Sequence, residues 1–192
     1  VTAIRGNHDR YLIDWPREKM GSWDRPAYDD LESKQLDWIR ELPPTRVHGE
    51  DVFLCHGIPA DDETYWLETV RSDGAVCLSS LESIVAAAEG VAQSLILCGH
   101  THIPRAVRLP DRRLIVNPGS VGCPGFRHDV PYLHTIEAGT PDASYAILER
   151  QSASWSVTFR QVPYDHGAMA SLARERGHAD WADVLETGWV TP

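Results

Sequence analysis

Three short apolar segments, each followed by a turn that carries histidine, constrain the fold of this chain more than any other feature. They span residues 1–4, 51–55 and 94–98, and they lead into GNHD (6–9), HG (56–57) and GHTH (99–102). Apolar runs of this length between turn residues are typical of buried strands. Because ligands of α/β sheets bind at the carboxyl ends of strands, we expect these turns to line one cavity.

The remaining pattern indicates a helix in each interval between the apolar segments, then antiparallel strands, and finally a helical tail. Helices are predicted over 28–42, 79–90 and 166–187, and strands over 105–109, 113–117, 132–137, 144–149 and 155–162. Pro43 and Pro44 end the first helix, whereas Ser79 and Glu82 have the spacing of a capping box at the start of the second. Two packed sheets with outer helices follow from this order. We predict one domain over residues 1–192, with 166–192 as a helical C-terminal cap.

Composition excludes several classes of protein. The net charge of −10 disfavours binding to a nucleic-acid duplex, whose phosphates it would repel. No apolar run approaches the roughly 18 residues of a membrane span. The four cysteines are widely spaced without a C-x-x-C pair, so we expect buried free thiols and a cytoplasmic location.

The histidines after the apolar segments suggest metal chemistry. A single histidine there is more commonly a hydrogen-bonded group than a ligand, but several strand ends deliver one here. The glycine of GHTH lets the backbone bend so that His100 and His102 face one cavity. Imidazole nitrogens, together with the carbonyl oxygen of Asn7, are suitable ligands for Mn, Fe, Zn or Ni. These ligands are all neutral, and we interpret the acidic run 61–63 as a solvated loop.

Four motifs in this order resemble the later motifs of the calcineurin-like metallophosphoesterases: GNHD (6–9), CHG (55–57), GHTH (99–102) and NPGSVG (117–122). The motif NPGSVG is similar to the corresponding motif in the small bacterial, phosphodiesterase-like branch of this family. The resemblance extends from residue 1 to about residue 165. It implies a four-layer αββα sandwich of two mixed sheets with flanking helices, and two divalent metal ions between the sheets.

The resemblance also implies roles for individual residues. Asn7, His56 and His100 would bind one metal ion, and His102 would bind the other. His8 would contact the substrate phosphate and assist the leaving group, Asp9 would orient His8, and Arg5 would touch the phosphate. The family has two earlier motifs, D-x-H and G-D-x-x-D, so we expect roughly 60 further residues upstream of Val1.

The predicted function is hydrolysis of small phosphate esters by a hydroxide that two metal ions activate, with the helical tail as a candidate dimer contact. Alternatives on the same fold are a dinucleoside polyphosphate hydrolase, a protein phosphatase, or a non-catalytic scaffold that has lost its first metal. His8 favours catalysis, because a scaffold need not retain it. The Gly-rich segment 119–125 lacks the Lys-Ser/Thr of a P-loop and is interpreted as a turn. Trp66 is a candidate pocket residue, and His128 a candidate at the pocket mouth.

Overall fold

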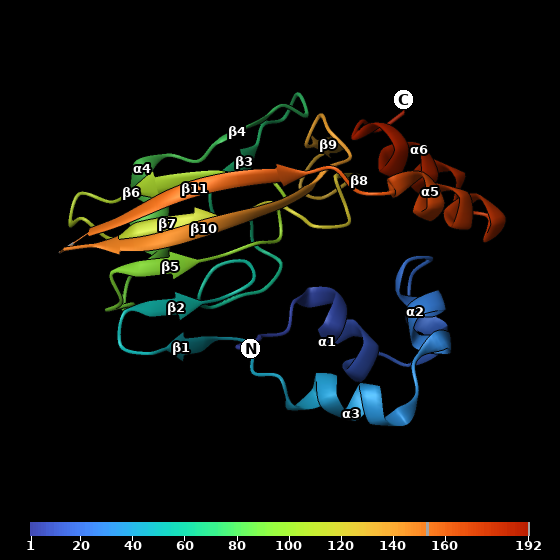
Figure 1. Cartoon of the computed structure of the whole chain (residues 1–192), viewed down its shortest axis with the longest axis horizontal. Helices are drawn as coiled ribbons and strands as arrows, with labels where there is room; N and C mark the ends of the chain where they lie inside the picture. Colours follow the sequence, from blue (N-terminus) through green and yellow to red (C-terminus); the bar gives the residue numbers. More distant parts are fainter. Residues whose placement is uncertain (153, 192) are drawn as a thin grey trace.

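A five-stranded mixed sheet forms the centre of the computed structural model, which describes residues 1–152 and 154–191 (Figure 1). Its order is β1 (Arg46–His48), β2 (Val52–Leu54), β5 (Leu95–Leu97), β7 (Leu114–Asn117) and β6 (Arg105–Arg108). The three inner strands are parallel, whereas the edge strands β1 and β6 pair antiparallel. The carboxyl ends of β2, β5 and β7 therefore lie at one end of the sheet.

Both faces of this sheet are covered, because successive strand residues point to opposite sides. Leu95, Leu114 and Val116 pack against the long ribbon of β10 (Ala143–Gln151) and β11 (Ser154–Val162). Ile96 and Ile115 face the other way, toward α4 (Leu81–Ala87). Two further antiparallel pairs are β3 (Glu68–Val70) with β4 (Val76–Leu78), and β8 (Gly125–His128) with β9 (His134–Glu137).

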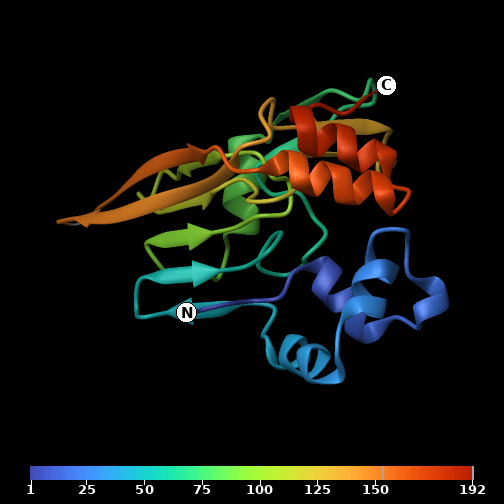
Figure 2. The ribbon, with the colours of Figure 1, turned by 45° about the vertical axis from the view of Figure 1, so that its right-hand side comes forward.

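The other helices gather at the end of the sheet where the parallel strands finish (Figure 2). They are α1 (Asn7–Asp14), α2 (Asp24–Asp30), α3 (Ser33–Glu41), α5 (His166–Glu175) and α6 (Ala179–Thr187), with a 3₁₀ turn at Arg17–Lys19. Helices α1 to α3 bury Leu12, Met20 and Ile39 together, and α5 packs on α6. None of the helices in the described ranges has the length and apolarity needed to cross a bilayer.

The predicted α/β class, with a mixed sheet and flanking helices, is confirmed. The layer opposite α4 is the two-stranded β10–β11 ribbon. The hairpin over 105–117 and the break near Gly177 in the helical tail are also observed. Cys55 and Cys98 are buried free thiols, as expected.

Several local predictions were wrong. Residues 1–4 are not a strand, although the backbone N–H of Arg5 donates to the carbonyl of Pro43. The helix expected over 28–42 is divided, because Glu32 begins a new helix whose first turn includes a Gln35 side chain bonded to the Glu32 N–H. The N-cap of helix α4 is Ser80 and not the expected Ser79, because the hydroxyl of Ser80 accepts from the N–H of Ser83. Helix α1 and strands β1, β3, β4 and β8 were missed.

Candidate metal centre and substrate pocket

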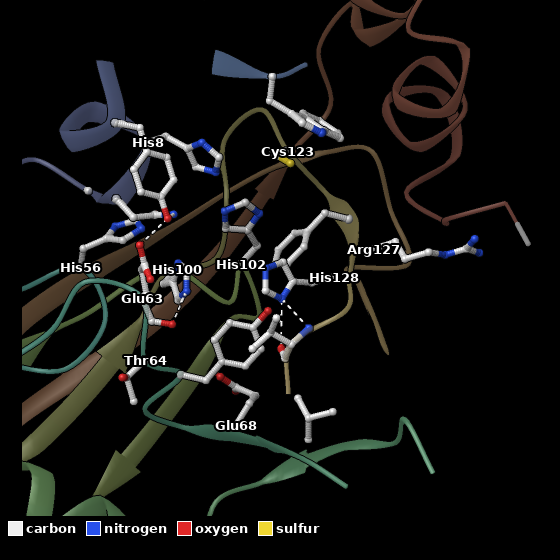
Figure 3. Close-up of a pocket in the computed structure, with 18 of the residues that line it drawn as sticks. His8, His56, Glu63, Thr64, Glu68, His100, His102, Cys123, Arg127 and His128 are labelled. Carbon is white, nitrogen blue, oxygen red and sulfur yellow. Dashed lines mark hydrogen bonds between the residues drawn. The ribbon is translucent and has the colours of Figure 1, made fainter. Parts of the chain in front are cut away.

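A pocket of about 580 Å³ opens where β2 and β5 end (Figure 3). Most of the residues expected at the site line this pocket: Asn7, His8, Asp9, His56, His100 and His102. His128 lies at the pocket as expected. Arg5 was also expected at the site, but it is not among the described residues that line the pocket. The tertiary structure thus brings together side chains from three distant segments of the chain.

The ring of His56 lies between two glycines. A Cβ atom at Gly6 would stand 2.8 Å from Cε1 and Nδ1 of His56, and one at Gly99 would stand 3.6 Å from its Nδ1. The backbone of Gly6 is extended, so space rather than dihedral freedom requires glycine there. Burial lowers the pKa of His56 to about 3, which keeps the imidazole neutral. Neutral imidazole is the form that binds metal.

Gly6→Ala is expected to weaken metal binding, because the new methyl group displaces the His56 ring from its position. We expect a loss of metal affinity of about 10-fold or more, the size seen when the surroundings of a ligand are disturbed. Isothermal titration with Mn²⁺ measures the effect. Gly21→Ala is the matched control, since the nearest atom to its added Cβ is 3.7 Å away. Equal Mn²⁺ affinities for the two variants would contradict the prediction.

The GHTH turn has an unusual backbone that a buried network supports. His100 and His102 have φ angles of 67° and 58°, in the left-handed region that residues other than glycine seldom adopt. Between them, Thr101 is 1% exposed and donates its hydroxyl to Oε2 of Glu68 at 2.6 Å. Asn117 donates to Oγ1 of Thr101 at 2.9 Å and to the carbonyl of Gly99 at 2.8 Å. These bonds hold the turn in its strained conformation.

The same network extends away from the pocket. Nε of Arg105 donates to Oε1 of Glu68 at 2.6 Å, and the side chain of Glu68 is fully buried. Oδ1 of Asn117 accepts from the backbone N–H of Gly119 at 3.0 Å. NPGSVG therefore contributes an asparagine that supports the histidine turn. Sequence reasoning missed the supporting roles of Glu68 and Asn117. Asn117 was visible as the first residue of NPGSVG, whereas no pattern in the sequence marked Glu68.

Two buried side-chain atoms at the pocket lack a hydrogen-bond partner among the described residues, as atoms reserved for a cation would. Oδ1 of Asn7 and Nδ1 of His102 are buried and have no hydrogen-bond partner in the described structure. Such atoms are rare in folded proteins and require an explanation. Nε2 of His100 donates to the carbonyl of Glu63 at 2.8 Å, which leaves Nδ1 free to bind. Burial also lowers the pKa of His102 to about 4, so its imidazole is neutral as well.

These donors are neutral, and the acidic side chains at the pocket are already engaged. Among the described residues, no group of three or more His, Cys, Asp or Glu side chains is close enough to hold a metal ion. Glu63 accepts from Arg10 at 2.7 Å and from the hydroxyl of Tyr11, while Glu68 is paired with Arg105. The side chains of Asn7 and of the pocket histidines therefore fit as part of the ligand set of a metal ion. Carboxylates would complete such a set by adding negative charge.

His8 is oriented by a residue other than the expected one. Its Nδ1 donates to Oδ1 of Asp24 at 2.5 Å, and Asp24 on α2 is only 7% exposed. The side chain of Asp9 instead accepts the backbone N–H of Gly6 at 2.8 Å. Asp9 occupies the third position of α1, where a carboxylate reaches back to the first turn. The prediction that Asp9 orients His8 is therefore replaced by Asp24.

The acidic run 61–63 is a loop in which Asp61 and Glu63 are exposed, as interpreted, but it also connects the segment after His56 to α1. Asp62 accepts two bonds of 2.8 Å from the guanidinium of Arg10, one from Nε and one from Nη2. The Arg10 hydrogen bond holds the pKa of Asp62 below its usual value. Oδ1 of Asp61 accepts from the backbone N–H groups of Glu63 and Thr64. These bonds fix α1, which carries Asn7 and His8, relative to the loop that follows His56.

The tryptophan that lines the pocket is Trp23 and not the expected Trp66. Trp66, the candidate from sequence, is 4% exposed, packs in the core, and donates to the carbonyl of Ile84. Trp23 lines the pocket instead and is 37% exposed. No local pattern distinguishes the two positions, because Trp23 reaches the pocket only through the placement of α2.

Comparisons with known proteins identify the fold and the family of this chain. The family model described as the calcineurin-like phosphoesterase superfamily domain matches residues 1–139. A metallophosphoesterase from Sphaerobacter thermophilus superposes with a TM-score of 0.69 at 22% identity, covering 97% of this chain and 76% of that one. A hypothetical protein from Pyrococcus horikoshii OT3 superposes with a TM-score of 0.71 at 16% identity, covering 100% and 74%. At these identities, the two structures show a shared fold. No curated protein matched the chain. By the match over residues 1–139, the chain belongs to the calcineurin-like phosphoesterase superfamily.

Proposed function

We propose that this protein hydrolyses phosphate esters of small molecules with the help of two bound divalent metal ions. The family supports metal-dependent hydrolysis of phosphate esters in general. The observation that carries the proposal is the pair of orphaned buried acceptors, Asn7 Oδ1 and His102 Nδ1, in a pocket that also contains His8. A buried acceptor without a donor is expected where a cation binds.

In this proposal Asn7, His56 and His100 hold one ion, and His102 holds the other. Bound Mn, Fe, Zn or Ni ions would activate water near neutral pH and neutralise charge on the phosphoryl oxygens. The protein keeps the imidazoles neutral by burial, and it fixes their orientation through Thr101 and the carbonyl of Glu63.

His8 acts on the leaving group. Because Nδ1–H is donated to Asp24, the ring presents its other nitrogen, Nε2, with 64% of the side chain exposed. When protonated, Nε2 donates to the leaving oxygen of the ester, which is the role of a general acid. Asp24 is the positioning residue, since its carboxylate fixes the tautomer and the orientation of the ring.

A covalent route through cysteine is disfavoured. Cys123 lines the pocket, but burial raises the pKa of its thiol to about 11. The thiolate is the nucleophilic form, so this sulfur is inert near neutral pH.

A substrate panel tests the proposal. The full-length protein is loaded with Mn²⁺ and incubated with bis-p-nitrophenyl phosphate, p-nitrophenyl phosphate, a dinucleoside tetraphosphate and a phosphopeptide. We expect hydrolysis of the small aryl esters, its loss on chelation by EDTA, and its recovery when Mn²⁺ is restored. Cleavage of the phosphopeptide alone would favour a protein phosphatase, and no cleavage with metal bound would favour a scaffold. A cytoplasmic location and a homo-oligomer stay predictions.

A further inference from the structure

The pocket extends beyond the histidine side chains into a region that a phosphate group bound beside them would leave empty. Its volume of about 580 Å³ is in the range that binds organic ligands of drug size. The additional wall is apolar and largely aromatic, and it consists of Trp23, Tyr65, Phe126, Val130 and Pro131. We call these five residues the aromatic wall. Exposed apolar side chains gathered at a pocket mark a binding surface.

The rings of the aromatic wall are held in place by their surroundings. The ring of Trp23 lies 4.5 Å from that of Trp181 on α6, and Phe126 contacts His102 edge-on at 5.1 Å. The hydroxyl of Tyr65 donates to Nε2 of His134 at 3.0 Å, because Nδ1–H of His134 is donated to a backbone carbonyl. Rings that are fixed before binding lose little conformational freedom when a ligand arrives.

The C-terminal hairpin, which is the helix pair α5 and α6, supports the pocket indirectly. Besides the contact between Trp181 and Trp23, Arg176 at the end of α5 donates to Asp30 of α2 at 2.7 Å. The hairpin lies outside residues 1–139, to which the family model matches. It holds α2 in the position from which Trp23 lines the pocket.

Charge at the aromatic wall favours an uncharged group over a second phosphate. Arg127 is the one arginine or lysine among the described residues that line the pocket. Its Nη2 donates to the carbonyl of Thr191 at 3.1 Å, and Figure 3 shows its side chain extending away from the histidines. A polyphosphate chain would require cations here, whereas an aromatic ring requires the faces of other rings.

We propose that the aromatic wall binds a planar aromatic ring, of the size of a nucleobase, carried by the phosphate ester. The inference rests on the proposed function and narrows its substrates to esters such as nucleoside monophosphates and aryl phosphodiesters. The phosphate lies toward the imidazoles, and the ring stacks at Trp23.

Calorimetric titration with two ligands tests this inference, on Mn²⁺-loaded protein that carries His8→Ala so that hydrolysis of either ligand during the measurement is slow. AMP and ribose 5-phosphate share sugar and phosphate, but only AMP carries a ring. We expect AMP to bind about 10-fold more tightly, since one base stacked on an aromatic side chain contributes that much. Trp23→Ala abolishes the preference, and Trp23→Phe keeps most of it. Trp38→Ala is the matched control, because Trp38 on α3 is 57% exposed and lies outside the pocket lining.

The outcomes separate this inference from the proposed function. Equal affinities of AMP and ribose 5-phosphate would overturn the ring site, even if the aryl esters are hydrolysed. A preference for AMP that survives in Trp23→Ala would overturn the assignment to Trp23. A preference for AMP without turnover of any ester would leave the ring site standing and overturn the hydrolase. If Trp23→Ala does not fold, two measurements still test the ring site. They are the affinities of AMP and ribose 5-phosphate for the protein with Trp23 intact, and the same affinities for Trp23→Phe.

Discussion

His8→Ala is expected to lower kcat for bis-p-nitrophenyl phosphate about 100- to 10,000-fold, the usual contribution of a general acid. The variant should keep its metal, because the proposed ligands are Asn7, His56, His100 and His102. Alanine cannot donate a proton to the leaving oxygen, and because the side chain of His8 is exposed, we expect the variant to fold normally. Steady-state kinetics and metal content measured on the same samples check the prediction.

Asp24→Asn tests how His8 is oriented. Asparagine can no longer take Nδ1–H as a charged acceptor, so we expect kcat to fall while KM changes little. Asp29→Asn is the matched control on the same helix, since Asp29 is exposed and pairs with Arg17 away from the pocket. Wild-type kcat in His8→Ala would refute the role of His8. A wild-type kcat in Asp24→Asn alone would refute only the positioning by Asp24.

Thr101→Val is expected to weaken Mn²⁺ binding about 10- to 100-fold, the effect seen when outer hydrogen bonds of metal ligands are removed. Valine has nearly the shape of threonine but cannot donate to Glu68 or accept from Asn117. The turn that holds His100 and His102 at positive φ then loses its support. Calorimetric titration with Mn²⁺ measures the change.

Two controls separate this effect from a general loss of stability. Thr101→Ser restores the hydroxyl and should recover most of the affinity. Ile96→Val removes one methylene group from the core on β5 and should lower the free energy of unfolding by about 0.5–1.5 kcal/mol without weakening Mn²⁺ binding. If Thr101→Val binds Mn²⁺ as tightly as the unmodified chain, the buried network does not support the metal ligands.

The sequence alone determined the α/β class and the convergence of the histidines. The segments 51–55 and 94–98 contain the strands β2 and β5, whose residues 52–54 and 95–97 are all apolar because neighbouring elements cover both faces of the sheet. Parallel pairing of β2 with β5 then places the turns after them at the same end of the sheet. Strand identity and direction were therefore sufficient to bring His56 and the GHTH turn to one pocket.

Only the tertiary structure decided which side chains support that pocket. The bond between His8 and Asp24, the bond between Thr101 and Glu68, and the contact between Trp23 and Trp181 join residues far apart in sequence. Periodicity and capping patterns describe neighbours within a few residues, and they carry no information on which distant helix or strand a side chain meets. Such contacts arise when separate elements pack, so their partners become known only once the elements are placed in space.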